Sequence, residues 1–438
     1  MSGLGLVAAC AAIGRLPNLV EAPAAFFALF GVAFGCHLVG SAVLWNRTGR
    51  AVLVFTSVIA GAARLVLLPA APTLSTDAYR YVWDARVAAS GINVYRYPPT
   101  AEALAPLRDT DVFPKLNHRD WRTVYPPLAQ AFFRLVYALA PDSVMAMKLS
   151  LGLVEAVAAA VLLGVLHGLG LPAGRLAVYA WHPLVLVEIW GSGHLDALAL
   201  LAVVAALWAA LKRAPRLAGM LIGVGTLVKL YPAALLPLLV GSRPIVPLAV
   251  FAATLTLGCL PLVPLGSEGL GSLPRYLSEE YFNPGLVRSM VDWLPLTVAI
   301  AGVAVAWITR RPAPVLRRAL WLSGIVTILS PNVFPWYAVW IVPMLTVAAS
   351  IPWLAFTATV GLAYTFFLQE PWAIPRWARL VEFSPLVLGA LWWVGRRLPQ
   401  LGAVRRHRVD KNVTSGAGTE VLTSGPPAGR PATEERWN

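Results

Sequence analysis

Residues Ala51–Asp84 read AVLVFTSVIAGAARLVLLPAAPTLSTDAYRYVWD. The first part, Ala51–Ala71, is an apolar run long enough to cross a hydrocarbon core of about 30 Å, and it must be helical because lipid offers no partner to an unpaired backbone group. The second part, Ser75–Asp84, gathers carboxylates, cations and aromatic rings directly after that run. The stretch therefore predicts a membrane-spanning helix followed by a loop with chemistry at a bilayer surface.

The composition extends this interpretation to the whole chain. Hydrophobic residues make up 58% of the 438 residues and charged residues only 13%, whereas an average soluble domain has about 25% charged residues. Membrane-length apolar runs recur along the chain, which predicts an all-α, polytopic transmembrane helical bundle with about 12–14 crossings.

The formal charge of +14 lies mainly in short connectors between apolar runs and in the C-terminal tail. Cytoplasmic loops of membrane proteins carry such an excess of Lys and Arg, so the pattern predicts the sidedness of the chain and argues against nucleic-acid binding. The connector cations are Arg47, Arg50, Lys212, Arg213, Arg216, Arg310, Arg311, Arg317 and Arg318. With these residues inside, the loop 72–142 lies outside.

Three regions follow from this topology. We expect N-terminal hydrophobic segments in 1–50, a transmembrane domain with folded outer loops in 51–396, and a disordered basic cytoplasmic tail in 397–438, which is too rich in Gly, Pro, Thr and charge to bury a core. Within the first outer loop, 126–140 is too short to cross and holds Arg134 near its middle, so we expect a helix that lies against the outer leaflet.

Two further features concern the later part of the chain. The stretch 217–240 must leave and re-enter the membrane, and we expect two half-helices that break around Lys229–Pro232, because Pro favours such a break. A second outer loop, 264–292, predicts a short surface helix. Its polar residues are Tyr276, Glu279, Glu280, Tyr281 and Arg288.

The polar side chains that are not explained as connectors fall on the predicted outer side. Ionisable groups near hydrocarbon cost several kcal/mol each unless they are paired or hydrated, so their convergence from distant segments predicts one outward-opening cavity. These residues are Asp77, Asp84, Tyr125, His194, Asp196, Lys229, Asn332, Trp336 and Tyr337.

Asp77 is the candidate catalytic residue. Its carboxylate, at the start of the loop with Tyr79 and Tyr81 as aromatic walls, suits a general base that takes a proton from a hydroxyl group. The alternative is helix capping, since Thr76-Asp77 is also an N-cap pattern. The surrounding Asp-x-x-Arg-Tyr-x-x-Asp pattern favours the base.

Several other residues have two interpretations. Asp84 either contributes to the site or forms a structural pair with Arg80 or Arg86. Lys229 and His194 suit a departing phosphate, but Lys229 could instead extend its ammonium to the interface. Trp336 and Tyr337 could belong to the interfacial aromatic belt. A metal site formed by His194, Asp196 and Asp77 is an alternative that a single histidine supports weakly.

Five motifs together resemble GT-C-fold glycosyltransferases, and in particular glycosyltransferase family 87 and related bacterial mannosyltransferases that use polyprenyl-phosphate-mannose. The motifs are Ser75–Asp84, Gly91–Tyr95, Tyr125–Leu128, His182–Ala197 and Lys229–Pro232. In that family the first outer loop supplies an aspartate base, and the matching residue is Asp77. The stretches 319–330 and 339–350 are expected to form a late hairpin with its outer tip at Ser330–Tyr337. Many relatives have histidines after the tryptophan of this late hairpin, where this chain has Trp336-Tyr337.

The resemblance implies an inverting sugar transfer from a polyprenyl-phosphate carrier to a glycan or glycolipid acceptor, at the outer face of the cytoplasmic membrane and without a metal or other cofactor. Asp77 would act as the base. Donor-binding candidates are Tyr79, Arg80, Tyr81, Asp84, Tyr125, His194, Asp196, Lys229, Asn332, Trp336 and Tyr337. A polytopic transporter or lipid-sugar flippase remains the alternative, because broken helices and intramembrane charges also occur in carriers.

Overall fold

The computed structural model describes residues 1–239, 244–280, 282–287, 289–290, 294–368, 370 and 372–415, and all regular elements in this part of the chain are helices. The chain forms two units, Met1–Leu386 and Val387–Asn438. Five apolar helical stretches among the described residues are long enough to cross a membrane: Pro23–Leu44, Arg50–Leu67, Val144–Gly168, Ile245–Glu279 and Ile351–Leu368. These findings confirm the polytopic helical bundle, while the number of crossings stays a prediction.

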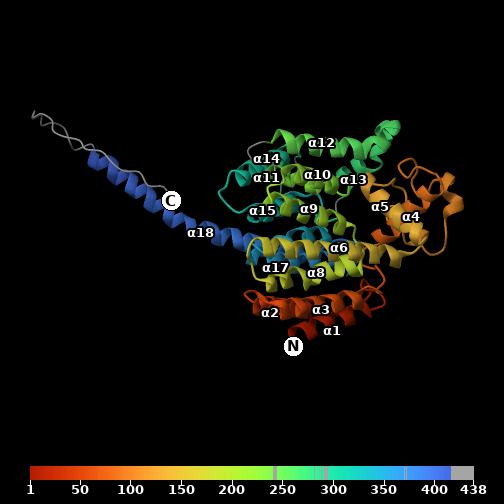
Figure 1. Cartoon of the computed structure of the whole chain (residues 1–438), viewed down its shortest axis with the longest axis horizontal. Coiled ribbons are helices and arrows are strands. Elements are labelled where there is room, and N and C mark those ends of the chain that lie inside the picture. The colour runs from red at the N-terminus through yellow and green to blue at the C-terminus, as the bar shows by residue number, and fades with distance from the viewer. Residues whose placement is uncertain are drawn as a thin grey trace, which may run out of the picture. The chain divides into compact units, whose positions relative to one another are not determined.

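The first three helices lie side by side at one edge of the bundle (Figure 1). They are α1 (Ser2–Gly14), α2 (Pro23–Leu44) and α3 (Arg50–Leu67). A Cβ on Gly40 would come within 2.5 Å of the Trp181 ring, so this glycine lets α2 pack closely against the following part of the bundle. The predicted N-terminal segments thus pack within the first unit.

The first outer loop is a folded subdomain at one end of the helices (Figure 1). It contains α4 (Asp77–Ala89), the 3₁₀ helices η1 (Glu102–Leu107) and η2 (Phe113–Lys115), and α5 (Pro127–Leu139). Arg86 holds it together through ion pairs of 2.6 Å to Asp109 and 2.7 Å to Asp142. In α5, Phe133 is buried while Leu135 and Leu139 are exposed, as expected for a helix that lies on a membrane surface.

The next segment leads back to the same end of the bundle. It comprises α6 (Val144–Gly168), η3 (Ala173–Leu176), α7 (Ala177–Ala180), α8 (Pro183–Val185), the π-helix η4 (Leu186–Gly191) and α9 (Asp196–Leu211). The stretch 176–190 is therefore a chain of short helices, because Pro183 interrupts the regular hydrogen bonds. Arg64 and Glu155 form a buried 2.7 Å ion pair between α3 and α6, and Trp190 of η4 donates a 2.8 Å hydrogen bond to Glu155.

The predicted break near Lys229 is confirmed. The helix α10 (Pro215–Thr226) ends just before it, and η5 (Tyr231–Leu235) and α11 (Leu236–Leu239) follow it. After four residues outside the described part, Arg243 included, the chain continues through α12 (Ile245–Cys259), η6 (Leu260–Leu270) and α13 (Leu273–Glu279). The helix α13 is the expected surface helix, whereas Tyr281, Arg288 and Asp292 lie outside the described residues.

The last part of the first unit closes the bundle. It contains α14 (Leu294–Thr309), α15 (Val315–Leu329), η7 (Pro335–Ile341), α16 (Val342–Leu345), α17 (Ile351–Thr359), η8 (Val360–Leu368) and the start of α18 (Arg376–Ser415). The sequence predicted disorder from 397, but α18 continues to Ser415. The stretch 403–415 has neither Gly nor Pro, and so it lacks the residues that most oppose a helix. Residues 416–438 lie outside the described part.

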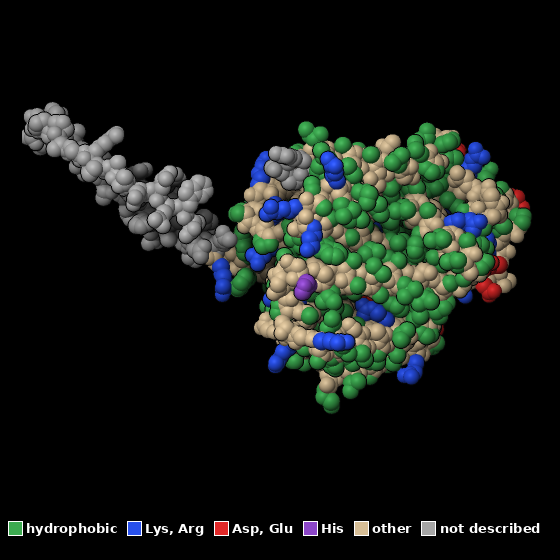
Figure 2. Space-filling model, viewed as in Figure 1, with side chains coloured by type: hydrophobic (Ala, Val, Ile, Leu, Met, Phe, Trp, Pro, Cys, Tyr) green, Lys and Arg blue, Asp and Glu red, His purple; other side chains and the backbone are tan. Residues whose placement is uncertain are grey.

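The connector cations and the first outer loop lie at opposite ends of the bundle. The helix α3 begins at Arg50 and ends at Leu67, where the chain enters the loop that carries Asp77, and α9 begins at Asp196 and ends at Leu211, next to Lys212. Between the ends, apolar side chains cover much of the visible face (Figure 2), and the exposed ones include Val54, Val58, Leu153 and Val157. This surface suits contact with lipid.

Candidate active site

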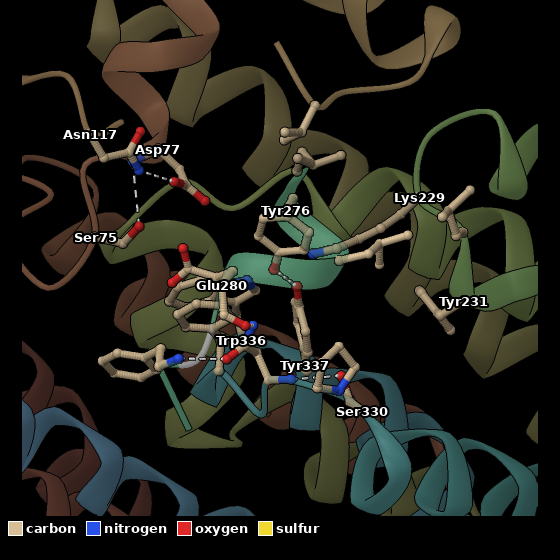
Figure 3. A pocket seen from close by; sticks show the side chains of 18 of the residues that line it. Ser75, Asp77, Asn117, Lys229, Tyr231, Tyr276, Glu280, Ser330, Trp336 and Tyr337 are labelled. Atoms are coloured by element: carbon tan, nitrogen blue, oxygen red, sulfur yellow. Dashed lines mark hydrogen bonds between the residues drawn. The ribbon is translucent and has the colours of Figure 1, made fainter. Parts of the chain in front are cut away.

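A cavity of about 1130 Å³ opens at the end of the bundle that carries α4 and α5. The first outer loop, the break after α10, α13 and the hairpin between α15 and α16 all contribute to its wall. In Figure 3, Asp77 and Lys229 lie on two sides of the space, with Tyr276 and Tyr337 between them. The predicted convergence of distant polar segments at one cavity is therefore present.

Asp77 is the first residue of α4, but it does not act as a cap. Thr76 occupies the N-cap position without a side-chain cap hydrogen bond. Asn117 donates a 2.7 Å hydrogen bond to Oδ1 of Asp77, and Oδ2 lies 3.6 Å from Nδ1 of His194. Burial alone would raise the pKa of Asp77, but His194, Asn117 and the charge of Lys229 outweigh burial and lower it. The carboxylate is thus ionised and faces the cavity.

His194 lies behind Asp77 and is absent from the cavity wall. It occupies the turn between η4 and α9, which Gly193 permits with a φ of +77°. The ring is fully buried, stacks on Trp336 at a centroid distance of 4.0 Å, and places Nε2 3.4 Å from Oε2 of Glu188. The expected direct contact with a phosphate is not supported, because the ring is enclosed by protein.

Lys229 lines the cavity and is paired with a buried carboxylate. Its Nζ lies 2.8 Å from both carboxylate oxygens of Asp196, which also accepts a 2.6 Å hydrogen bond from Nε1 of Trp340. The ammonium lies 4.4 Å from the ring centroid of Tyr337, and the side chain remains 20% exposed. Lys229 therefore does not extend away to the interface. Because an ammonium has three donors, at least one is left for a ligand.

The aromatic residues of the late hairpin are buried and line the cavity, which argues against the aromatic-belt interpretation. Trp336 and Tyr337 are 8% and 9% exposed, and the Tyr337 hydroxyl shares a 2.7 Å hydrogen bond with that of Tyr276. Asn332 joins the second outer loop to this hairpin, because Nδ2 donates to the Glu280 carbonyl at 2.6 Å and Oδ1 accepts from the Phe282 amide at 2.7 Å.

Arg80 and Asp84 form the structural pair that the sequence left open. Nε of Arg80 lies 2.8 Å from Oδ1 of Asp84, and both side chains are buried. Arg80 also donates to the Trp121 carbonyl at 3.0 Å, while Gln130 donates to Oδ2 of Asp84 at 2.8 Å. A third donor, Nη1 of Arg80, bonds the His118 carbonyl at 3.5 Å. This ion pair fixes the loop that carries Asn117, and three of the five donors of Arg80 are already used.

The predicted site residues fall into two groups, those that line the cavity and those that do not. Those at the cavity are Asp77, Arg80, Tyr125, Lys229, Asn332, Trp336 and Tyr337. Those outside its wall are Tyr79, Tyr81, Asp84, His194 and Asp196. Residues three apart share a helix face, so Arg80 follows Asp77 toward the cavity, whereas Tyr81 turns away and stacks on Phe133 at 4.4 Å. The expected aromatic walls from Tyr79 and Tyr81 are thus replaced by rings of the late hairpin.

Sequence reasoning missed several residues of the site. They are Asn117, Glu188, Tyr276, Glu280 and Tyr364. A carboxylate inside an apolar run is costly unless it is paired or functional, and this signal could have identified Glu188. The other four have no comparable local signal, because their positions depend on how two outer loops and the last helices come together.

A long apolar wall continues the cavity away from these polar groups. It is formed by Ala301 and Val305 of α14 and by residues of α15. The α15 residues are Leu322, Ile325, Val326 and Leu329, which extend over about 10 Å at 1.5 Å per residue. Because Ser330 follows this helix at the polar end, the cavity has a charged end and an apolar arm.

The proposed metal ligands do not converge. Asp196 is paired with Lys229, while His194 lies against Asp77. Among the residues that the structure describes, no three His, Cys, Asp or Glu side chains form a group that could hold a metal ion.

Comparison with known families identifies one match. A family model described as "Alpha-(1->6)-mannopyranosyltransferase, N-terminal domain" matches residues 5–243, which is more than half of the 438 residues. The matched part includes Asp77, His194 and Lys229 and ends before the late hairpin. The match confirms the resemblance to mannosyltransferases of the GT-C type. No curated protein and no solved structure matches the chain significantly.

Proposed function

Because the chain belongs to the alpha-(1->6)-mannopyranosyltransferase family and is a mannosyltransferase, we propose that it transfers mannose from a polyprenyl phosphate to an acceptor hydroxyl. The acceptor is an envelope glycan or glycolipid, and the reaction takes place at the outer face of the cytoplasmic membrane. The new bond is an α(1→6) linkage formed with inversion at the anomeric carbon.

One observation carries this proposal: an aspartate and a lysine share a cavity that continues as an apolar arm. The Asp77 carboxylate can accept a proton from a hydroxyl group, and the Lys229 ammonium can bind a phosphate. The apolar wall along α14 and α15 can pack against a hydrocarbon chain. A lipid-linked sugar phosphate and its acceptor together have these three chemical parts.

The reaction then proceeds as a single displacement. The acceptor oxygen forms a bond with the anomeric carbon as Asp77 takes its proton, a general-base role typically worth about 10²–10⁴-fold in rate. The bond between that carbon and the phosphate oxygen breaks, and the electron pair leaves with the phosphate. Lys229 stabilises this negative charge with its remaining N–H donor. Asn117 and Asp196 hold the two groups in place, so positioning contributes as well.

The donor's lipid chain lies along the apolar arm. Leu322, Val326 and Leu329 present hydrocarbon along one side of α15, and Ala301 and Val305 do so from α14. Burial of apolar surface contributes roughly 25 cal/mol per Å², so several isoprenoid units in this arm would add considerably to donor binding. The phosphate then lies at the polar end, beside Lys229.

The proposed orientation of the protein in the membrane rests on the distribution of its cationic residues. The connector cations lie at the end of the bundle opposite Asp77, and Lys- and Arg-rich loops are normally cytoplasmic. This supports an active site at the outer face. The resemblance further implies a reaction without a bound metal, which stays a prediction.

Purified protein in vesicles with labelled polyprenyl-phosphate-mannose tests the proposal. Label in a mannosylated acceptor with release of polyprenyl phosphate is the expected result. Label that crosses the bilayer with the sugar–phosphate bond intact would support the lipid-sugar flippase alternative. Transfer from a nucleotide-linked mannose, with no use of the lipid-linked donor, would overturn the proposed donor.

A further inference from the structure

A second buried carboxylate lies directly behind the proposed base. Glu188 belongs to the π-helix η4 and is completely buried. The hydroxyl group of Tyr364 donates to its carboxylate, with distances of 2.9 and 3.0 Å to the two oxygens. Its Oε2 lies 3.4 Å from Nε2 of His194. Glu188 therefore faces the ring on the side opposite Asp77.

The local backbone holds this arrangement. The amide of Ser192 donates to the Val187 carbonyl at 2.8 Å, which is the i−5 bond of a π-turn, and the amide of His194 donates to the Glu188 carbonyl at 3.1 Å. π-Turns occur frequently at functional sites. Here the turn lets Glu188 and His194 face each other although they are close in sequence.

The imidazole of His194 is thus enclosed by two carboxylates. The distances of 3.6 Å to Asp77 and 3.4 Å to Glu188 suit an attraction between charges. Neither ring nitrogen has another hydrogen-bond partner within the described part of the chain. Burial lowers the pKa of His194, but the two carboxylates outweigh it and raise that pKa to about 9.

Other charged and titratable groups act on this ring only through its neighbours. Tyr364 of η8 binds Glu188, and Lys229, paired with Asp196, acts on Asp77 across the cavity. Lys148 of α6 packs its stem against Gly193, but its ammonium binds the Leu68 and Ala70 carbonyls. The hydroxyl group of Tyr81 accepts from the Leu195 amide at 3.4 Å. Asp77 and Glu188 therefore dominate the surroundings of His194.

We propose that Glu188 is a positioning residue for the transfer reaction: its charge keeps His194 protonated, and the imidazolium in turn holds Asp77 ionised and correctly oriented. This inference rests on the proposed role of Asp77 as the base. The proton of the acceptor still goes to Asp77, and no proton leaves His194 during the reaction.

The protonation state of His194 gives the transfer reaction a defined pH dependence. Below the pKa of His194, at about 9, the ring is charged and the site is active. Above it the ring becomes neutral; Asp77 stays ionised there, but it loses the charge that orients its carboxylate, and activity falls. Without the charge of Glu188 one attraction to the imidazolium is lost, so the alkaline loss of activity moves to lower pH. At pH values well below the pKa of His194 the rate changes little, because Asp77 still faces a charged ring.

Glu188→Gln tests the inference in the full chain, by the pH profile of mannose transfer in vesicles. We expect the alkaline midpoint to fall by about 1–3 pH units, the usual effect of one opposite charge within 4–6 Å, while most of the rate on the acid side is retained. Tyr364→Phe is the matched control, because it removes a neighbour of Glu188 and leaves the charge. Its midpoint should stay at or above that of the unaltered protein.

An unchanged midpoint with a uniformly lower rate in Glu188→Gln would overturn the inference, since that is the result of a purely structural role. If this variant does not fold, His194→Gln replaces it. That variant should be slow and lack the alkaline limb near the pKa of about 9, and a limb that persists there would equally contradict the inference. Failure of the proposed function can be distinguished from failure of this inference, because only in the former case would Asp77→Asn retain turnover.

Discussion

Asn117 fixes one oxygen of the Asp77 carboxylate. Its Nδ2 donates a 2.7 Å hydrogen bond to Oδ1 across a separation of 40 residues in the same outer loop. The other oxygen, Oδ2, faces His194. The carboxylate is therefore held from two directions before any substrate binds, which is the preorganisation that a general base needs.

Replacement of Asn117 should slow the reaction without preventing it. A hydrogen bond to a charged group contributes about 1.5–3 kcal/mol, and each 1.36 kcal/mol in the barrier changes a rate about tenfold. We expect Asn117→Ala to lower kcat by about 10- to 100-fold. The control is Asn93→Ala, which removes an exposed asparagine whose Oδ1 accepts from the local Tyr95 amide. Equal rates for the two variants would contradict the role of Asn117.

Lys229 has two separable contributions, to folding and to donor use. Lys229→Met leaves Asp196 buried without its cation, and loss of one partner of a buried pair costs about 3–5 kcal/mol. We expect a large fall in thermal stability together with weaker use of the lipid-linked donor. Addition of Asp196→Asn should restore most of the stability and none of the donor use. A double variant that also recovers donor use would show that Lys229 is only structural.

The apolar arm can be blocked from inside. Ala301 of α14 lines the arm, whereas Val303 on the same helix is 71% exposed and faces away from it. Ala301→Trp should raise KM for a long-chain polyprenyl donor much more than for a short-chain analogue, because only the long chain needs the arm. Val303→Trp is the matched control and should leave both values unchanged. The same KM change for both donors would place the lipid chain elsewhere.

The ion pair of Arg64 and Glu155 should stabilise the bundle only as a pair. Glu155→Leu leaves the Arg64 guanidinium buried and unpaired, at a cost of about 3–5 kcal/mol. The double variant Arg64→Leu/Glu155→Leu removes both charges and should recover most of this loss, although the Trp190 indole loses its acceptor. Thermal unfolding in detergent measures both effects. A double variant less stable than the single one would be inconsistent with this account.

Much of the fold follows from residue types alone. The cost of unpaired backbone in lipid and the bias of cations toward one side predicted α3, the surface helix α5 and the break beside Lys229. The π-helix η4 and the short helices before it were not predicted, since they depend on how Pro183 and the buried ion pair of Glu155 are accommodated in the packed bundle. The helical extension of α18 to Ser415 was not predicted either.

The site was less predictable than the fold, because side-chain directions depend on helix register. Asp77 and Lys229 were correctly expected at one cavity, since both carry charge beside apolar runs. His194 was expected there too, but its turn directs the ring behind Asp77. Glu280 reaches the cavity through long-range docking of the second outer loop onto Asn332, and no local pattern of residues encodes that contact.

The most direct test of the account is mannose transfer by Asp77→Asn. This substitution keeps the size of the side chain and removes its ability to take a proton. With purified protein in vesicles and labelled polyprenyl-phosphate-mannose, we expect turnover to fall by about 10²–10⁴-fold, while thermal stability and donor binding remain close to those of the unaltered protein. Turnover within a few-fold of the original, from a folded variant that binds donor, would contradict the role of Asp77 as the base.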